Sequence, residues 1–263
     1  MRVATFNLLH GHSLHSGRVD RDDLAAAAAE LDCDVLGLQE VDRFQDRSGG
    51  IDQTSVVAGA LGAEHWRFVA AIDGTPGLEW AQAQGDGSTA ADPIGESGPA
   101  YGVGLVSRFP VTSWHVRRFP SAPVGMPLMV PGKRGLTHVL DEPRVAVAGV
   151  LDGPAGPLTV VTAHLSFVPG WNVAQLRTLV AWARQLPGPR LLLGDLNLPG
   201  SLPRVTSRWT QLARAATYPS YQPRVQFDHV LADGIPESAV YDVRSVRLPV
   251  SDHRALVVDL RLG

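Results

Sequence analysis

The chain has 263 residues, of which 44% are hydrophobic and 19% charged, and this composition excludes an intrinsically disordered protein. Its formal net charge of −3 lacks the basic excess typical of sequence-independent nucleic-acid binding. Cys33 is the only cysteine, which excludes an intrachain disulfide, and no apolar run approaches the roughly 20 residues of a membrane span. We expect one domain over residues 1–263 and a monomeric, cytoplasmic protein without an integral membrane segment.

The first part of the chain predicts buried strands that alternate with two helices. An alanine-rich segment over 20–31, with acidic residues in its first turn, predicts the first helix. The second helix is predicted over 53–61, with Asp52 as its N-cap and Gly62 at its end. Short apolar runs typical of strands occupy residues 2–8, 34–39 and 66–70.

Two later segments lack a sustained periodicity and predict irregular structure. Residues 71–99 are rich in Gly, Ala, Asp and Pro and contain no Lys or Arg, so we expect a long loop. This loop is either a lid over the functional site or a plain surface insertion. Residues 121–135, which carry Lys133 and Arg134, predict a second irregular segment.

The rest of the chain predicts sheets with hairpins and one amphipathic helix. The helix is predicted over 173–186, where Leu176, Leu179, Val180 and Ala183 share one face. The predicted strands cover residues 101–107, 111–118, 144–151, 158–163, 190–193, 227–231, 240–246 and 255–260.

Polar side chains recur at one place in this pattern, the end of an apolar strand. Asn7, Glu40, His164 and Asp195 each follow such a run. Because side chains at strand ends project into a shared cleft while the strands supply rigidity, we expect these groups to meet. Carboxylate and amide oxygens suit a hard cation such as Mg²⁺ or Mn²⁺, whereas the ligand spacing of a zinc site is missing. The candidate oxygen donors are Asn7, Glu40, Asp195, Asn197 and Asp252.

Seven short motifs in a fixed order resemble those of a known family. They are Thr5-Phe6-Asn7, Leu38-Gln39-Glu40, residues 101–110 (YGVGLVSRFP), Thr162-Ala163-His164-Leu165, Gly194-Asp195-Leu196-Asn197, Phe227-Asp228-His229 and Ser251-Asp252-His253. Through them, over almost the whole chain, the sequence resembles the endonuclease/exonuclease/phosphatase superfamily and its small bacterial members. That superfamily includes deoxyribonucleases, apurinic endonucleases, neutral sphingomyelinases and inositol polyphosphate 5-phosphatases. The resemblance implies an α/β fold: a four-layered α/β/β/α sandwich of two mixed sheets flanked by helices, with the site at one end.

The resemblance also implies a set of metal ligands. Glu40 corresponds to the principal ligand, with Asn7 beside it and Asp252 as a further contributor. Asp195 and Asn197 correspond to residues that hold the metal or the attacking water and a phosphoryl oxygen. The expected cofactor is Mg²⁺ or Mn²⁺.

The catalytic roles implied by the resemblance centre on a histidine. His253 would contact the scissile phosphate, and Asp228 would fix its tautomer and raise its pKa. The resemblance implies in-line attack of water on phosphorus, with either Asp195 or His253 as general base. His164 would donate a proton to the leaving group or hold a phosphate oxygen.

Three further residues are candidates for substrate contacts. Asn172 corresponds loosely to a phosphate-contacting asparagine, and His10 follows Asn7 closely in the sequence. Tyr101 stands where the deoxyribonuclease branch carries a glutamate partner for its first histidine, which puts that pairing in doubt. For His229 we expect a structural role, because it neighbours Asp228 on a strand and points to the opposite face. For Arg144 we expect an internal salt bridge.

These motifs together predict a divalent-metal-dependent phosphohydrolase acting as a phosphodiesterase, nuclease or phosphatase. The alternative is a catalytically silent module of the same fold that binds a phosphorylated ligand or a partner. A small diester, a lipid headgroup and a nucleic acid all stay open as substrates.

Overall fold

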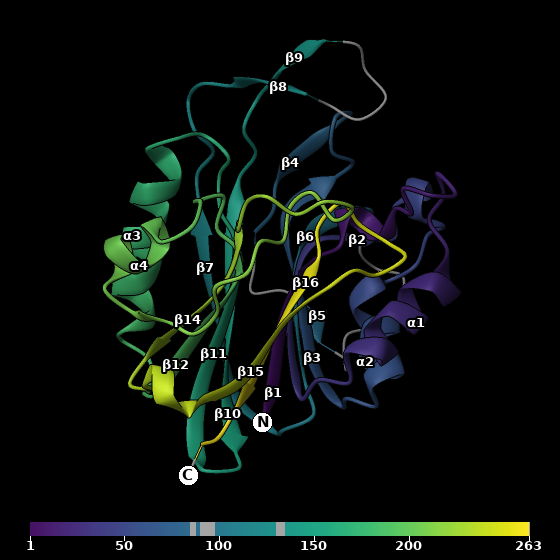
Figure 1. The fold of residues 1–263 in the computed structure, drawn as a ribbon. Helices are drawn as coiled ribbons and strands as arrows, with labels where there is room; N and C mark the ends of the chain where they lie inside the picture. The colour runs from purple at the N-terminus through teal and green to yellow at the C-terminus, as the bar shows by residue number, and fades with distance from the viewer. Residues whose placement is uncertain (85–87, 90–97, 130–134, 263) are drawn as a thin grey trace.

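Two β-sheets lie face to face at the centre of the molecule, and helices cover the outer face of each (Figure 1). The computed structural model describes residues 1–84, 88–89, 98–129 and 135–262. Within these residues the first sheet has eight strands in the order β15-β16-β1-β2-β6-β3-β4, with β5 paired to β3. They are β1 (Arg2–Asn7), β2 (Val35–Arg43), β3 (His65–Gly74), β4 (Trp80–Gln82), β5 (Ser88–Thr89), β6 (Ala100–Ser107), β15 (Val240–Val246) and β16 (Ala255–Leu260).

The second sheet has six strands among the described residues, in the order β13-β14-β12-β11-β10-β7. They are β7 (Val111–Phe119), β10 (Arg144–Gly153), β11 (Gly156–His164), β12 (Arg190–Asp195), β13 (Thr210–Gln211) and β14 (Asp228–Asp233). A separate ribbon of β8 (Met126–Met129) and β9 (Leu136–Val139) stands beyond the sheets, at the top of Figure 1.

The four α-helices of the described residues form the two outer layers. Helices α1 (Arg21–Leu31) and α2 (Gln53–Leu61) cover the first sheet, and α3 (Trp171–Ala183) and α4 (Leu202–Ser207) cover the second (Figure 1). Side chains cap two of them: Asp20 accepts hydrogen bonds from the first turn of α1, and Asp52 accepts one from the first turn of α2. Short 3-10 turns lie at Leu9–Gly11, Asp46–Ser48 and Glu237–Ala239. None of the described helices is long and apolar enough to cross a membrane.

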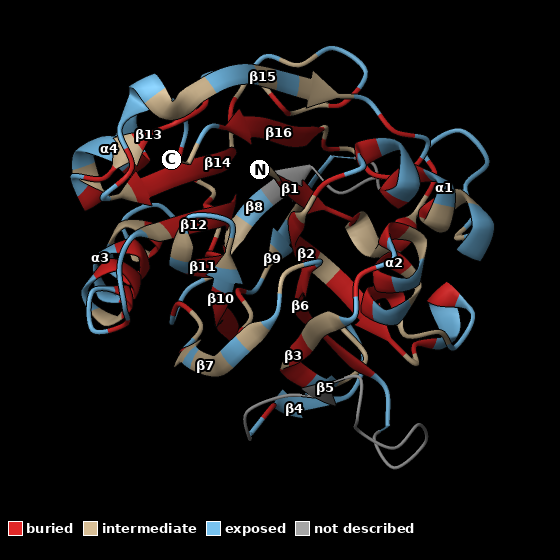
Figure 2. Ribbon diagram, turned by 90° about the horizontal axis from the view of Figure 1, so that it is seen from below, coloured by how far each residue is buried: buried red, intermediate tan, exposed pale blue. Residues whose placement is uncertain are grey.

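Strand β1 illustrates how the sequence divides between the layers. Val3 belongs to the apolar core between the sheets, whereas Ala4 and Phe6 belong to the core under α1 and α2. Because successive side chains of a strand point to opposite faces, a strand covered on both sides is apolar throughout. Figure 2 shows this arrangement, with β1 and β2 buried and the helices of the outer layers partly buried and partly exposed.

A short polar chain interrupts the apolar contact between the two sheets. The Thr5 hydroxyl donates to Gln39 Oε1 at 3.1 Å, and Gln39 Nε2 donates to Thr162 Oγ1 of the second sheet at 2.9 Å. All three side chains are fully buried, so each polar atom needs a partner within the protein. Gly37 permits this close approach, because a Cβ there would lie 2.7 Å from Thr162 Oγ1.

The structure confirms the four-layered sandwich and corrects the two predicted loops. Residues 71–99 are not one long loop, because β3 continues to Gly74 and the short strands β4 and β5 follow. Residues 121–135 contain β8, while Lys133 and Arg134 lie outside the described residues. The side chains of β4 are all exposed, so the strand lacks the apolar alternation by which a sequence reveals it. The short elements β9, β13 and α4 also gave no recognisable pattern.

His229 on β14 is a core residue, as the sequence predicts. Its side chain is fully buried, and its Nε2 lies 2.8 Å from the carbonyl oxygen of Leu198. Burial lowers the pKa of His229 to about 4, although this carbonyl contact and the neighbouring Asp228 oppose the effect. His229 is therefore a neutral packing group at physiological pH.

We predict that Gly37→Ala destabilises the protein by about 1–3 kcal/mol, because the added methyl group separates the sheets at Thr162. Gly59→Ala is the control, since a Cβ at this exposed position of α2 meets nothing within 4 Å. It should stabilise the protein by about 0.4–1 kcal/mol. Urea denaturation measures both changes, and equal effects would contradict the assigned packing.

We also predict that His229 lowers the free energy of unfolding as the pH decreases from 6.5 to 4, whereas buried carboxylates with raised pKa values, such as Glu40, act in the opposite direction. The unfolded chain takes up a proton on His229 near its ordinary pKa of 6.5, whereas the folded chain resists protonation down to about 4. The contribution of this one histidine amounts to about 3 kcal/mol. In urea titrations at several pH values, His229→Gln should remove this contribution to the pH dependence of the free energy of unfolding. His15→Gln on an exposed loop is the matched control.

Candidate active site

The strand register brings the predicted polar residues to one end of the sandwich. In the first sheet, parallel β1 and β2 pair Asn7 with Gln39, the neighbour of Glu40. In the second sheet, parallel β11 and β12 pair His164 with Asp195. Antiparallel β14 then places Asp228 opposite Asp195. The candidate site is therefore built from both sheets, at the end where β1, β11 and β12 finish.

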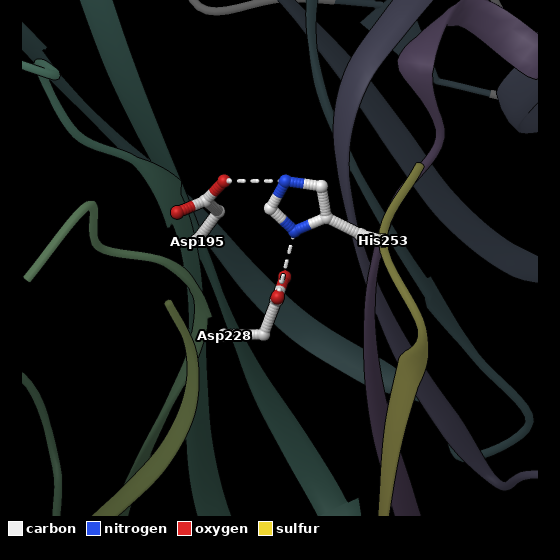
Figure 3. Close-up of side chains that lie close together, drawn as sticks. All are labelled: Asp195, Asp228 and His253. Atoms are coloured by element: carbon white, nitrogen blue, oxygen red, sulfur yellow. Dashed lines mark hydrogen bonds and ion pairs between the residues drawn. The ribbon is translucent and has the colours of Figure 1, made fainter. Parts of the chain in front are cut away.

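Asp195, Asp228 and His253 form the centre of this site (Figure 3). His253 Nδ1 lies 2.8 Å from Asp228 Oδ2, and its Nε2 lies 3.8 Å from Asp195 Oδ2. The Thr217 hydroxyl donates a further hydrogen bond to Asp228 Oδ2. Asp228 thus holds the Nδ1 side of the imidazole ring, which leaves Nε2 directed at Asp195.

Asn7 joins two carboxylates that come from opposite sheets. Its Nδ2 donates to Glu40 Oε1 at 2.9 Å and to Asp195 Oδ2 at 3.0 Å. Its Oδ1 accepts a hydrogen bond from the amide of Leu9 at 3.0 Å, which fixes the orientation of the carboxamide. In this arrangement Asn7 turns its amide hydrogens to the carboxylates, and its predicted role as an oxygen ligand stays a prediction.

Ser251 attaches the segment that carries Asp252 and His253 to β1. Its hydroxyl donates to the carbonyl of Asn7 at 2.6 Å and accepts from the amide of His253 at 3.0 Å. Ser251 has a φ of 77°, and Glu40 and Asn197 also have positive φ values of 53° and 50°. Non-glycine residues rarely adopt this region, and such strain gathers at functional sites.

Burial sets the protonation of the carboxylates around the site. It raises the pKa of Glu40 to about 7, although the hydrogen bond from Asn7 opposes this, and Asp252 raises the value further by repulsion. Burial also raises the pKa of Asp195 and of Asp252, in both cases against the attraction of His253. Burial and mutual repulsion thus oppose the negative charges of these three carboxylates. A divalent cation would relieve this repulsion, and carboxylate oxygens are suitable ligands for it.

His253, unlike the carboxylates, is favoured in its charged form. Burial alone would lower its pKa, but the charge and the hydrogen bond of Asp228, followed by the charges of Asp195 and Asp252, raise the pKa to about 10. The ring therefore carries a proton on both nitrogens at neutral pH, with Nε2–H free to donate into the site.

His164 is held in the neutral form. Arg144 Nη1 lies 3.3 Å from His164 Nδ1, while Asn197 Nδ2 lies 3.2 Å from its Nε2. Burial lowers the pKa of His164 well below its ordinary value, and the charge of Arg144 lowers it further. Arg144 also forms the internal salt bridge that the sequence predicts, to Asp141 at 3.0 Å. The charged neighbour of His164 is thus an arginine. The deoxyribonuclease branch pairs this histidine with a glutamate, at the position where this chain has Tyr101.

These residues surround a cleft of about 830 Å³, and most of the predicted site residues line it. Asn7 and Asp228 lie behind its wall and hold its lining residues. His10 does not line the cleft; its ring lies 5.8 Å from that of His12 and its carbonyl accepts a hydrogen bond from Gln53. The predicted residues that do line the cleft are Glu40, Tyr101, His164, Asn172, Asp195, Asn197, Asp252 and His253.

Among the charged groups of the cleft, sequence analysis missed two contributors, Glu142 and the contact of Arg144 with His164. Both belong to the segment Asp141-Glu142-Pro143-Arg144, whose last residue begins β10. The signal available in the sequence is a pair of charged residues at the start of an apolar strand, whereas the other site residues follow the ends of their strands. Asn172, in contrast, lies at the cleft as predicted, with its Nδ2 donating to the carbonyl of Asn197 at 2.9 Å.

Solved structures share this fold over nearly the full chain. An endonuclease/exonuclease/phosphatase from Beutenbergia cavernae DSM 12333 is 22% identical with a TM-score of 0.65, covering 100% of this chain and 72% of that chain. Bacteroides thetaiotaomicron mannosyl-6-phosphatase is 18% identical with a TM-score of 0.60, covering 100% of each chain. Sphingomyelinase C from Streptomyces griseocarneus is 14% identical with a TM-score of 0.60, covering 99% of each chain.

Comparison with curated protein sequences finds no match. The model of the Endonuclease/Exonuclease/phosphatase family, in contrast, matches residues 4–253. This match runs from β1 to His253 and so includes every strand end that contributes to the cleft. The chain belongs to the endonuclease/exonuclease/phosphatase family, whose members are hydrolases that act on phosphoesters.

Proposed function

We propose that the protein is a divalent-metal-dependent phosphohydrolase that cleaves a phosphate ester by in-line attack of water. The observation that carries this proposal is the convergence of three carboxylates and two histidines of opposite protonation on one cleft. The names of two structural neighbours, a mannosyl-6-phosphatase and a sphingomyelinase C, support hydrolysis of phosphate esters as the reaction class. Water attacks phosphorus, the bond between phosphorus and the alcohol oxygen breaks, and the alcohol leaves with one proton while the attacking water gives one up.

Glu40 and Asp252 would hold Mg²⁺ or Mn²⁺, with Asp195 and Asn197 at the edge of the same site. These side chains offer the oxygen donors that a hard cation prefers. The alternative set of Asp195, Asp228 and His253 has ligand atoms within 4.8 Å of one another, but Asp228 is already engaged by Thr217 and His253. When bound, the cation supplies positive charge to the phosphoryl oxygens.

The protonation of His253 favours Asp195 as the general base. A pKa of about 10 keeps His253 protonated at neutral pH, so its Nε2–H donates to a phosphoryl oxygen instead of accepting a proton from water. Asp195 Oδ2 lies 3.8 Å from Nε2 of both His164 and His253, at the centre of the cleft floor. Its pKa is raised by burial, which makes Asp195 a stronger base than an ordinary aspartate.

His164 acts as a neutral hydrogen-bond donor in this proposal. Arg144 Nη1 lies 3.3 Å from Nδ1, and Asn197 Nδ2 lies 3.2 Å from Nε2, so a donor faces each ring nitrogen. We assign the single proton to Nε2, which faces Asp195 Oδ2 at 3.8 Å, with the Asn197 amide hydrogens directed at the carbonyl of Leu165 instead. A histidine kept neutral at physiological pH holds a phosphoryl oxygen well but is a poor source of a proton for the leaving group. Of the two roles predicted for His164, the contact with a phosphate oxygen is therefore the one we propose.

We predict that Glu40→Gln and His253→Ala each lower kcat/KM by about 10²–10³-fold or more, because Glu40→Gln weakens the cation site and His253→Ala removes a positive hydrogen-bond donor to the phosphoryl oxygens. The assays use purified protein with Mg²⁺ or Mn²⁺ and a panel of 4-nitrophenyl monoesters and diesters, phospholipids and oligonucleotides. EDTA should abolish turnover and added metal should restore it. Glu30→Gln, on the exposed face of α1, is the matched control.

Calorimetry of Mg²⁺ and Mn²⁺ binding supplies a readout independent of turnover, and Glu40→Gln should weaken that binding. Release of no product from the whole panel by the wild-type protein would contradict the proposed activity. If phosphorylated ligands still bound, the silent binding module would become the better hypothesis.

We further predict that Asp228→Asn lowers the pKa of His253 by about 1–3 pH units, because the variant lacks the carboxylate that opposes burial. Titration of the imidazole signals by NMR in metal-free protein measures this value. Asp242→Asn, an exposed aspartate on β15, is the control. An unchanged pKa in Asp228→Asn would show that another group holds the proton on His253.

A further inference from the structure

The lining of the cleft is of two chemical kinds. The floor carries the carboxylates and histidines described above. Apolar side chains also line the cleft, from β9 and the residue after it, the loop before α3 and its first turn, and the segment that leads into α4. They are Val139, Leu140, Phe167, Val173, Pro199 and Leu202. We call these six residues the apolar wall.

The apolar wall continues onto the surface of the protein. Leu140 is 69% exposed and Leu202 is 47% exposed, although both line the cleft. Single exposed leucines are ordinary, but apolar residues continuous with a reactive cleft indicate a ligand surface.

The charges of the cleft disfavour a polyanionic substrate. Among its described lining residues, Arg144 is the only arginine or lysine, and it is buried against Asp141 and His164. Glu142 adds a carboxylate to the lining, and burial raises its pKa. A nucleic acid carries further phosphates on both sides of the scissile one, and these would meet no positive partner on the wall.

We propose that the substrate is an amphiphilic phosphate ester of lipid type, with its phosphate over the catalytic floor and its apolar chain along the apolar wall. This inference rests on the proposed function, because the floor must be the reacting site. A cleft of about 830 Å³ accommodates a phosphate together with a chain of several methylenes. Hydrolysis gives an alcohol and a phosphate product. The product that carries the alkyl chain stays in contact with the apolar wall.

A series of esters that differ only in chain length tests the inference. The substrates are methyl, butyl and octyl phosphates and the corresponding alkyl 4-nitrophenyl phosphates, used as monomers in solution. Burial of a methylene favours binding by up to about fourfold, and part of the chain stays exposed in an open cleft. We therefore expect kcat/KM for the octyl ester to exceed that for the methyl ester by roughly 10²-fold.

Substitution of the exposed leucines tests the location of the chain. The double variant Leu140→Ser and Leu202→Ser should reduce the octyl-to-methyl ratio about tenfold. Both side chains are largely exposed, so their loss does not open the core. Leu14→Ser is the matched control, because Leu14 is 47% exposed, as Leu202 is, but does not line the cleft. It should keep the wild-type ratio.

Binding distinguishes failure of this inference from failure of the proposed function. Methyl-, butyl- and octylphosphonate cannot be hydrolysed, and calorimetry with Mg²⁺ should show tighter binding and a more negative heat-capacity change as the chain lengthens. Absence of turnover with this binding trend would contradict only the activity. Turnover or binding without dependence on chain length would overturn the apolar wall as a chain site. Faster cleavage of an oligonucleotide than of the octyl ester would also overturn it.

A final comparison distinguishes a dissolved substrate from a membrane lipid. One phosphate ester group is supplied on a short-chain monomer in solution and on a long-chain lipid in vesicles. Hydrolysis of the monomer alone supports a dissolved amphiphile, and hydrolysis of the vesicle lipid supports a membrane source. Failure on both, with turnover of the methyl ester retained, would contradict the inference.

Discussion

The contact of Asn7 with Glu40 and Asp195 is the interaction on which the rest of the site depends. It joins a carboxylate from each sheet through a single buried carboxamide, so the site exists only while the sheets keep their spacing. Gly37 and Thr162 set that spacing a few residues away, where there is no room for a Cβ. The packing between the sheets therefore also sets the distances between the site residues at the strand ends.

The same arrangement explains how two histidines in one cleft acquire opposite protonation. Both are buried, and burial lowers the pKa of each. Asp228 reverses this effect at His253, whereas Arg144 reinforces it at His164. The two rings around Asp195 thus favour opposite protonation states. Asp228, together with Asp195 and Asp252, favours the cationic form of His253, whereas burial and Arg144 favour the neutral form of His164.

The apolar wall contrasts with this charged floor because it comes from different elements. The floor lies at the ends of central strands, whose positions follow from the sheets. The wall comes from β9, the loop before α3 and the start of α4, which are peripheral and short. A division of this kind lets the rigid sandwich hold the reacting groups while surface segments decide what else of the substrate is accepted.

The sequence by itself predicted the central strands from their apolar runs and most residues of the floor from polar groups at strand ends, such as His164 and Asp195. The layered fold followed from the resemblance of its motifs to a known family. It did not reveal β4, β9 or α4, because short exposed elements carry no periodic pattern. Only the tertiary structure placed Arg144 against His164, left His10 outside the cleft and assembled the apolar wall. These features depend on contacts between residues far apart in the chain, and no local pattern records such contacts.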